Sequence, residues 1–95
     1  GIGWYRLIEI LLSKIDIHSK YNLDPEIEVK ITQIKEKFGG LRVYYNGGDD
    51  FVRGLISMSE SISMHICEVC GENRFIHKNR KSGWLTTRCT HHIND

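Results

Sequence analysis

The sequence predicts an α+β fold in which a helix, a β-hairpin and a second helix are followed by a small zinc-ribbon-like module. Apolar residues recur at helical spacing in two stretches and alternate with polar residues between them, and two close pairs of metal-ligand residues lie near the end. A chain of 95 residues fits one compact domain. We expect residues 1–66 to form its body and residues 67–95 to form a module docked on that body.

The first helix is predicted to begin near Trp4 and to end by about Lys20. Its apolar residues follow the i, i+3, i+4, i+7 series of an amphipathic helix and leave charged residues for the opposite face. The only proline, Pro25, stands with polar neighbours that start at Asn22, and this group marks a break after the helix. The apolar residues of the helix are Trp4, Leu7, Ile8, Leu11, Leu12 and Ile15.

A β-strand is predicted after this break. Ile27, Val29 and Ile31 alternate with polar residues, which is the period of a half-buried strand. The same stretch also has apolar residues at helical spacing, but its β-branched side chains favour a strand. The apolar phase shifts between Ile31 and Ile34, which indicates a β-bulge.

A second strand completes the predicted hairpin. Gly39-Gly40 permits a turn with positive φ angles, and an alternating run of apolar residues follows it at Leu41, Val43 and Tyr45. The glycine pair fits no known phosphate-loop pattern, so a structural turn is favoured over an anion site. Candidate partner contacts near this turn are Lys35, Lys37 and Arg42.

The second helix is predicted to begin at Asp49-Asp50, because an acidic N-cap suits free backbone N–H groups and the positive end of the helix dipole. Apolar residues at spacings of four, three, four and four form its expected apolar stripe. No linker separates this helix from Cys67, so we expect a rigidly docked metal module. The stripe consists of Phe51, Leu55, Met58, Ile62 and Ile66.

Two close pairs of residues, Cys67 with Cys70 and Cys89 with His92, predict a zinc site. A Cys-x-x-Cys turn presents two thiolates, and the second pair supplies the other corners of the tetrahedron that zinc prefers. Four protein ligands leave no open position for a substrate, so the expected role of zinc is structural. The alternatives are a site in which zinc activates a water molecule and a site without metal.

His91 competes with His92 for the fourth position of this site. We favour His92, because its Cys-x-x-His spacing mirrors that of the first pair and lets both ligands emerge from one turn. Between the two pairs, residues 74–77 and 84–87 are predicted to form two short strands, which a loop at residues 78–83 connects. This hairpin gives the module its zinc-ribbon-like character.

Composition indicates a cytoplasmic protein without a membrane segment. All three cysteines fall within the predicted metal site, which leaves none for a disulfide and fits a reducing compartment. No stretch approaches the roughly 20 apolar residues of a membrane span, and the first residues lack the order of a signal peptide. The formal net charge of +1 gives no global argument for nucleic acid, and no serine–histidine–aspartate set or carboxylate pair indicates a hydrolase.

Basic residues are nevertheless concentrated in the predicted metal module, where residues 73–88 include no Asp or Glu. With Phe75 and Trp84 among them, these residues could contact phosphates while an aromatic ring stacks on a base. The alternatives are a solvated hairpin tip and a contact with an acidic protein. The basic residues are Arg74, Lys78, Arg80, Lys81 and Arg88.

Five short motifs in this order resemble a small family found in bacteria and their phages. Its members share Gly-x-Gly-Trp before an amphipathic helix, then Lys-x-Lys-Phe-Gly-Gly-Leu-Arg-x-Tyr, a second helix, Cys-Glu-x-Cys-Gly, Gly-Trp and Cys-x-x-His. The resemblance covers nearly the whole chain, and its phage association implies a host-interaction role such as inhibition of a bacterial defence system. The corresponding residues are Gly1–Trp4, Lys35–Tyr45, Cys67–Gly71, Gly83–Trp84 and Cys89–His92.

We therefore expect a non-enzymatic, zinc-stabilised binding protein that contacts a protein partner. A nucleic-acid-binding regulator that uses the basic zinc hairpin is the second hypothesis. A metal-dependent nuclease is the third, because the ending Cys-Thr-His-His-Ile-Asn resembles the His-His-Ile of HNH nucleases. It ranks last, because an HNH core also needs a further downstream Asn and His and the sequence ends at Asp95.

Overall fold

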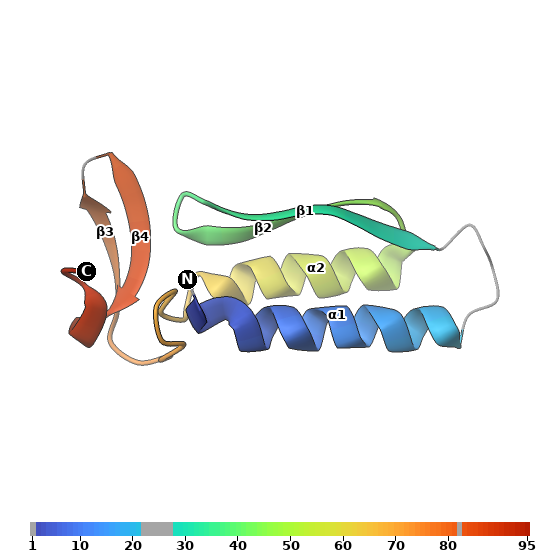
Figure 1. Ribbon diagram of the computed structural model, residues 1–95, viewed down its shortest axis with the longest axis horizontal. Coiled ribbons are helices and arrows are strands. Elements are labelled where there is room, and N and C mark those ends of the chain that lie inside the picture. Colours follow the sequence, from blue (N-terminus) through green and yellow to red (C-terminus); the bar gives the residue numbers. More distant parts are fainter. Residues whose placement is uncertain (1, 22–27, 82) are drawn as a thin grey trace.

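A computed structural model describes residues 2–21, 28–81 and 83–95, apart from the side chain of Lys81. The predicted order of helix, hairpin and helix is confirmed, and a second hairpin follows (Figure 1). The break predicted at Asn22–Pro25 and the strand start at Ile27 lie outside the described residues. The elements are a 3-10 helix (Ile2–Trp4), α1 (Tyr5–Lys20), β1 (Val29–Lys37), β2 (Gly40–Gly47), α2 (Asp50–Ser63), β3 (Ile76–Lys81), β4 (Trp84–Cys89) and a second 3-10 helix (Thr90–His92).

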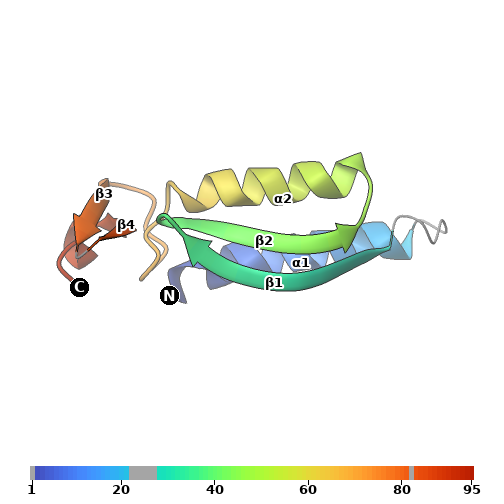
Figure 2. The same cartoon turned by 90° about the horizontal axis from the view of Figure 1, so that it is seen from above.

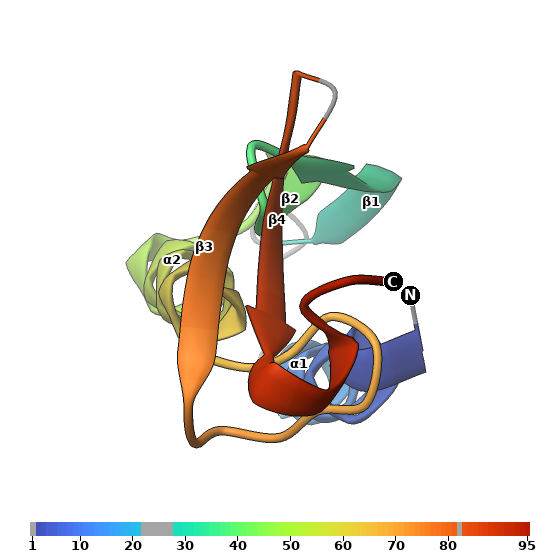
Figure 3. The same ribbon diagram turned by 90° about the vertical axis from the view of Figure 1, so that its left-hand side faces the viewer.

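The molecule is elongated, with extents of 47 × 23 × 17 Å. Helices α1 and α2 lie side by side, the antiparallel hairpin β1–β2 covers them as a second layer, and the hairpin β3–β4 stands across one end (Figure 1). The N-terminus lies at that same end, beside the segment that connects α2 to β3 (Figure 3). Neither described helix combines the length and the apolar character that crossing a bilayer requires.

The hydrophobic core lies between the two helices and the first hairpin. Burial of its apolar surface is the main favourable contribution to folding in a domain of this size. Both helices, β2 and the first 3-10 helix contribute side chains that are at most 7% exposed, and partly buried residues of β1 pack against them, so the body folds around a single core. The buried residues are Trp4, Leu11, Ile15, Leu41, Val43, Val52 and Ile56.

Strands β1 and β2 pair with a register shift between Ile31 and Gln33, which confirms the predicted bulge. The turn differs from the expectation, because its two central residues are Phe38 and Gly39, with φ angles of 55° and 77°. Two positive φ angles match the right-handed twist of the strands in a two-residue hairpin. Gly40 instead begins β2, where a Cβ would lie 3.2 Å from Cγ of Met64.

The predicted N-cap of α2 is confirmed, because the Asp49 side chain accepts a hydrogen bond from the Val52 N–H. Of the predicted apolar stripe, Leu55 and Ile66 pack against the core, but the other three residues are exposed. Phe51, Met58 and Ile62 are 53%, 65% and 40% exposed. The fully buried face of α2 lies one residue further along the chain. The buried residues of α2 are Val52, Ile56, Ser59 and Ser63.

Hydrogen bonds explain how two serines occupy a buried helix face. Ser59 Oγ donates to the Leu55 carbonyl, and Ser63 Oγ donates to the Glu60 carbonyl. Ser63 Oγ also accepts a hydrogen bond of 2.8 Å from the Leu41 N–H of β2. Because buried hydroxyl groups with partners carry little desolvation cost, these serines are compatible with the core.

The second hairpin is longer than predicted. Strands β3 and β4 pair continuously from Ile76 with Cys89 to Lys81 with Trp84. Residues 78–81 were expected in a loop, but they belong to β3 and extend the ladder. Arg74 and Phe75 precede the strand, and helix α2 ends at Ser63 instead of running directly into Cys67.

Candidate metal centre

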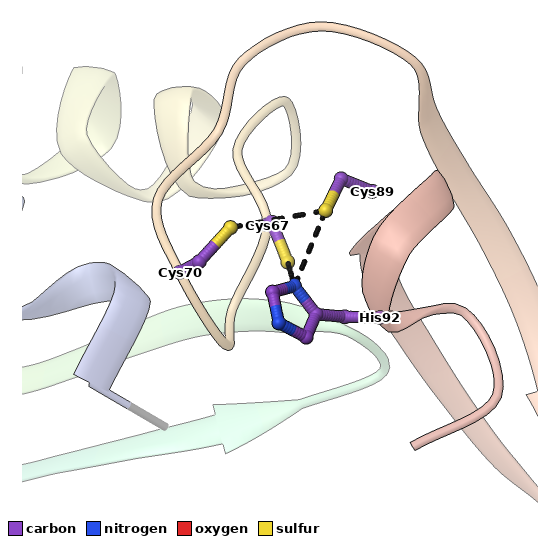
Figure 4. A group of neighbouring side chains, drawn as sticks. All are labelled: Cys67, Cys70, Cys89 and His92. Atoms are coloured by element: carbon purple, nitrogen blue, oxygen red, sulfur yellow. Dashed lines mark hydrogen bonds between the residues drawn. The ribbon is translucent and has the colours of Figure 1, made fainter.

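The four predicted ligands come from two segments that meet at the end of the molecule. Cys67 and Cys70 lie in the turn that follows α2, Cys89 ends β4, and His92 lies in the 3-10 helix after it. The side chains point toward one another (Figure 4). Their ligand atoms all lie within 4.8 Å of one another, so this Cys3His group could hold a metal ion. The group includes His92 and not His91, which is exposed.

Three of the six distances between the ligand atoms lie between 3.3 and 3.8 Å. The Sγ atoms of Cys70 and Cys89 are 3.7 Å apart. Nδ1 of His92 lies 3.3 Å from Cys89 Sγ and 3.8 Å from Cys67 Sγ. Within the part of the chain that the structure describes, no other group of three or more His, Cys, Asp or Glu side chains converges in this way.

Backbone amides favour the thiolate form of Cys67. Burial raises the pKa of this thiol, but the amides of Cys89, Cys70 and Val69 stabilise the thiolate and lower its pKa to about 6. For Cys70 the Glu72 amide acts to lower the pKa, yet burial and the neighbouring sulfurs of Cys89 and Cys67 together raise it. Three thiols in one place therefore resist joint ionisation, and a divalent cation would remove that repulsion.

The turn that carries Cys67 and Cys70 is bound to the amino-terminal end of the chain. The Gly3 N–H donates to the Glu68 carbonyl at 2.9 Å, and Nε1 of Trp4 donates to the Ile66 carbonyl at 3.4 Å. Sequence reasoning did not identify Gly3, Trp4 or Glu68 as supports of the site. The Gly-x-Gly-Trp motif was the available signal, because glycines beside an aromatic residue allow backbone segments to approach closely.

The same turn is also bound to strand β4. The Glu68 N–H donates to the Thr87 carbonyl at 2.9 Å, and Glu68 Oε1 accepts from Nε of Arg88 at 3.0 Å. Thr87 is fully buried, and its hydroxyl donates to the Gly39 carbonyl at 2.6 Å. Through this bond the tip of the first hairpin contacts the second hairpin. Gly39 thus has a structural role, as the sequence favoured.

Most of the basic residues predicted as contacts in the metal module have intramolecular partners. Arg74 pairs with Glu72 and Arg88 pairs with Glu68. Nζ of Lys78 donates to the Thr87 hydroxyl, and burial, partly offset by the charge of Glu68, lowers the pKa of this ammonium group. Three of the five basic residues predicted as contacts are thus bonded to other residues of the chain. Of the other two, Arg80 is exposed, and the side chain of Lys81 lies outside the described residues.

The candidate contacts of the body lie on the outward face of the β1–β2 hairpin. Lys35 and Arg42 are paired across the two strands, and Lys37 lies opposite Gly40 beside the turn. Nζ of Lys35 lies 5.2 Å from the centre of the Tyr44 ring, and Lys37 lies over the Phe38 ring at 5.6 Å. Arg42 approaches Glu60 at 3.8 Å.

Comparison with known proteins supplies no further assignment. No family model, no curated protein and no solved structure matches this chain. What the chain does must therefore be inferred from its own residues and their geometry.

Proposed function

We propose that Cys67, Cys70, Cys89 and His92 hold a structural zinc ion in a ribbon-like module, and that the protein is a non-enzymatic binding protein. The convergence of three thiols and one imidazole within 4.8 Å carries this proposal. Thiolates and imidazoles are the ligands that zinc prefers in structural sites. The resemblance to a phage-associated family adds the proposal that the partner belongs to a bacterial host.

The distances within the group support zinc. Zn–S bonds of about 2.3 Å and a Zn–N bond of about 2.0–2.1 Å in a tetrahedron separate two sulfurs by roughly 3.8 Å and a sulfur from a nitrogen by roughly 3.6 Å. The sulfur–sulfur distance of 3.7 Å and the sulfur–nitrogen distances of 3.3 and 3.8 Å lie close to these values. A single ion would satisfy all four ligands with small movements of the side chains.

A structural role is favoured over a catalytic one, because four protein ligands fill the coordination shell of zinc. Cys67 and Cys89 are 0% and 2% exposed, so half of the site is closed to solvent. No position remains for a water molecule or a substrate unless a ligand leaves. The energy of metal binding would instead stabilise the turn after α2 and the end of β4.

Metal analysis of three proteins tests the proposal. The wild-type chain and the His91→Ala variant should each contain one zinc ion per molecule, whereas Cys89→Ser should lose it, because Ser is a far weaker zinc ligand than a thiolate. The measurement is elemental analysis together with native mass spectrometry. A plasmid-nicking assay with Mg²⁺ or Mn²⁺ serves as the enzymatic control.

Two outcomes contradict the proposal. If the wild-type protein folds without bound metal, zinc has no structural role. If the wild type nicks the plasmid and His91→Ala does not, the protein is a nuclease and not a non-enzymatic binding protein. Retention of zinc by His91→Ala is the matched control, since this neighbour differs from His92 by one position in the chain.

A further inference from the structure

We propose that the outward face of the β1–β2 hairpin, extended by a cavity between Phe38 and Trp84, binds single-stranded nucleic acid. The inference deepens the proposed binding function, on which it rests, by naming the chemical class of the partner. It moves the contact surface from the zinc module, where the sequence predicted a large part of it, to the body of the protein.

The pairing register defines the outward face. Alternate residues of β1 point toward the helices, and those between them point to solvent, as the burial pattern of the strand shows. Residues opposite one another in an antiparallel pair share a face. In Figure 2 this face is turned toward the viewer, with α1 behind it. The outward pairs are Lys30 with Asn46, Gln33 with Tyr44, Lys35 with Arg42, and Lys37 with Gly40.

This face is basic along its length. It carries Lys30, Lys35, Lys37 and Arg42, and within the two strands, both fully described, it includes no Asp or Glu. Arg42 is paired with Glu60 of α2 at 3.8 Å, so the three lysines carry most of the charge that a ligand would meet. The acidic residue of β1, Glu36, alternates with these lysines and belongs to the other face of the strand, where it accepts a hydrogen bond from the Gly39 N–H. Sequence reasoning identified three of the four cations and missed Lys30, because only the register shift places it in line with the others.

The arrangement of charge fits an extended polyanion. Lys30 and Lys37 are seven residues apart, which corresponds to about 23 Å along a strand at about 3.3 Å per residue. Such a length spans several nucleotides. The exposed Tyr44 ring lies among the cations, with Nζ of Lys35 5.2 Å from its centre. Phosphates would contact the ammonium and guanidinium groups while a base stacks on the ring.

Two further aromatic rings lie at the end of this face. Phe38, at the tip of the first hairpin, is 66% exposed, and Trp84, at the start of β4, is 68% exposed. Both line a cavity of about 230 Å³ together with Glu36, Lys37, Gly83 and Leu85. The Glu36 carboxylate at this cavity accepts a hydrogen bond from the Gly39 N–H. The exposed Arg80 lies opposite Leu85 in the β3–β4 ladder and adds a cation near the cavity.

These rings favour unpaired bases over a duplex. In double-stranded DNA or RNA the bases are stacked on one another and offer no free face to an aromatic side chain. An acidic protein would satisfy the cations equally well, but charge alone gives no role to two exposed rings beside a cavity. Single-stranded nucleic acid uses both features. DNA and RNA share this chemistry, and separate oligonucleotides distinguish them.

Fluorescence anisotropy with labelled 12-nucleotide DNA and RNA single strands tests the inference, with a duplex of the same length as comparison. Neutralising two cations of the face in Lys35→Gln/Lys37→Gln should weaken binding at least tenfold at low salt. It should also make the salt dependence shallower, because fewer counterions are released. The control Lys14→Gln/Lys20→Gln removes the same charge from α1 and should bind like the wild type.

A second variant separates stacking from charge. Trp84→Ala should weaken binding roughly tenfold or more through the loss of base stacking, while the salt slope stays near that of the wild type. Zinc content and resistance to proteolysis are measured on the same samples. These measurements verify that each variant is folded and metal-bound before its affinity is interpreted.

The inference is overturned by any of four results. These are a zinc-bound wild-type protein without affinity for either single strand at low salt, tighter binding to the duplex, equal loss of affinity in the α1 control, and equally tight binding of poly-glutamate to the same face. The last result would assign the face to an acidic protein. All four leave the proposed structural zinc intact, whereas a metal-free folded chain would contradict that proposal independently.

Discussion

Gly3 is the residue at which the amino-terminal turn and the metal-binding turn come closest. A Cβ atom at this position would lie 2.1 Å from the Cys67 carbonyl oxygen and 2.6 Å from the Glu68 carbonyl carbon. Real side chains do not approach backbone atoms so closely, so only glycine allows this contact. The neighbouring Trp4 is 3% exposed and connects the same turn to the core.

Two glycine-to-alanine substitutions should therefore have opposite effects on stability. Gly3→Ala should lower the free energy of unfolding by about 1–3 kcal/mol, because the added methyl group separates two backbone segments. Gly54→Ala should raise it by about 0.5–1 kcal/mol, because its Cβ meets nothing within 4 Å and alanine favours a helix. Thermal unfolding followed by circular dichroism measures both changes.

Equal effects of the two substitutions would contradict this description of the contact. In particular, a Gly3→Ala protein with the melting temperature of the wild type would show that the amino-terminal turn does not lie against Cys67. Gly54→Ala provides the matched control, because the same methyl group is added within a helix that the structure describes as open at that position.

Among the elements, α2 has the most clearly defined start. Asp49 accepts a hydrogen bond from the Val52 N–H through one carboxylate oxygen and contacts His18 Nε2 through the other at 2.7 Å. His18 also stacks on Phe51, with ring centres 4.4 Å apart. One side chain therefore caps α2 and connects it to the end of α1. The hydrogen bond from His18, followed by that from Val52, lowers the pKa of Asp49 below its ordinary value of 3.8.

Asp49→Asn should isolate the charge of this side chain, because asparagine is also a good N-cap. A carboxyl group whose pKa is lowered on folding stabilises the protein above its ordinary pKa of 3.8. That stabilisation is lost as the pH falls through the lowered value in the folded state. Urea unfolding should show the wild type as more stable than Asp49→Asn at pH 6, with the difference closing as the pH falls below 3.8. A difference independent of pH would contradict the lowered pKa of Asp49 in the folded state.

Local patterns predicted the order of elements, the bulge and the N-cap, because each depends on residues close in sequence. The buried face of α2 was not predictable in this way. The apolar series through Phe51 and the buried series through Val52, half of which is serine, differ by one residue, and packing against β2 and α1 decides which is buried. Ser63 looks polar in sequence, and its hydrogen bonds with the Glu60 carbonyl and the Leu41 N–H explain its burial.

At the scale of the whole molecule, the metal-binding module contacts the body through three segments. The amino-terminal turn bonds to Glu68, the tip of the first hairpin bonds to Thr87, and helix α2 leads into Cys67. Burial at these contacts is extensive, since Trp4 and Thr87 are at most 3% exposed. Loss of the proposed zinc ion should therefore disturb the body as well as the module.

The ligand group was predictable from sequence, because each pair of ligands lies within a single turn. Whether each basic residue has an acidic partner was not predictable, because such partners can be distant in sequence. Arg88 looks free in the sequence, yet Glu68, 20 residues earlier, pairs with it. Lys78 likewise looks like part of a loop, but the ladder pairs it with Thr87, whose hydroxyl accepts a hydrogen bond from Nζ of Lys78. The structure therefore shifts attention from these cations to the outward face of the first hairpin.

A zinc titration that uses Trp4 as the reporter tests the structural zinc site most directly. The Trp84→Phe substitution leaves Trp4 as the only tryptophan of the chain. In metal-free protein the emission of Trp4 should lie at longer wavelength than in zinc-bound protein. Added Zn²⁺ should shift the emission to shorter wavelength, because the ordered turn buries the ring. The shift should end at one equivalent of zinc. The same titration of Cys89→Ser in this background should give no shift. Emission already at the buried position before zinc is added, and unchanged by it, would contradict a structural zinc site.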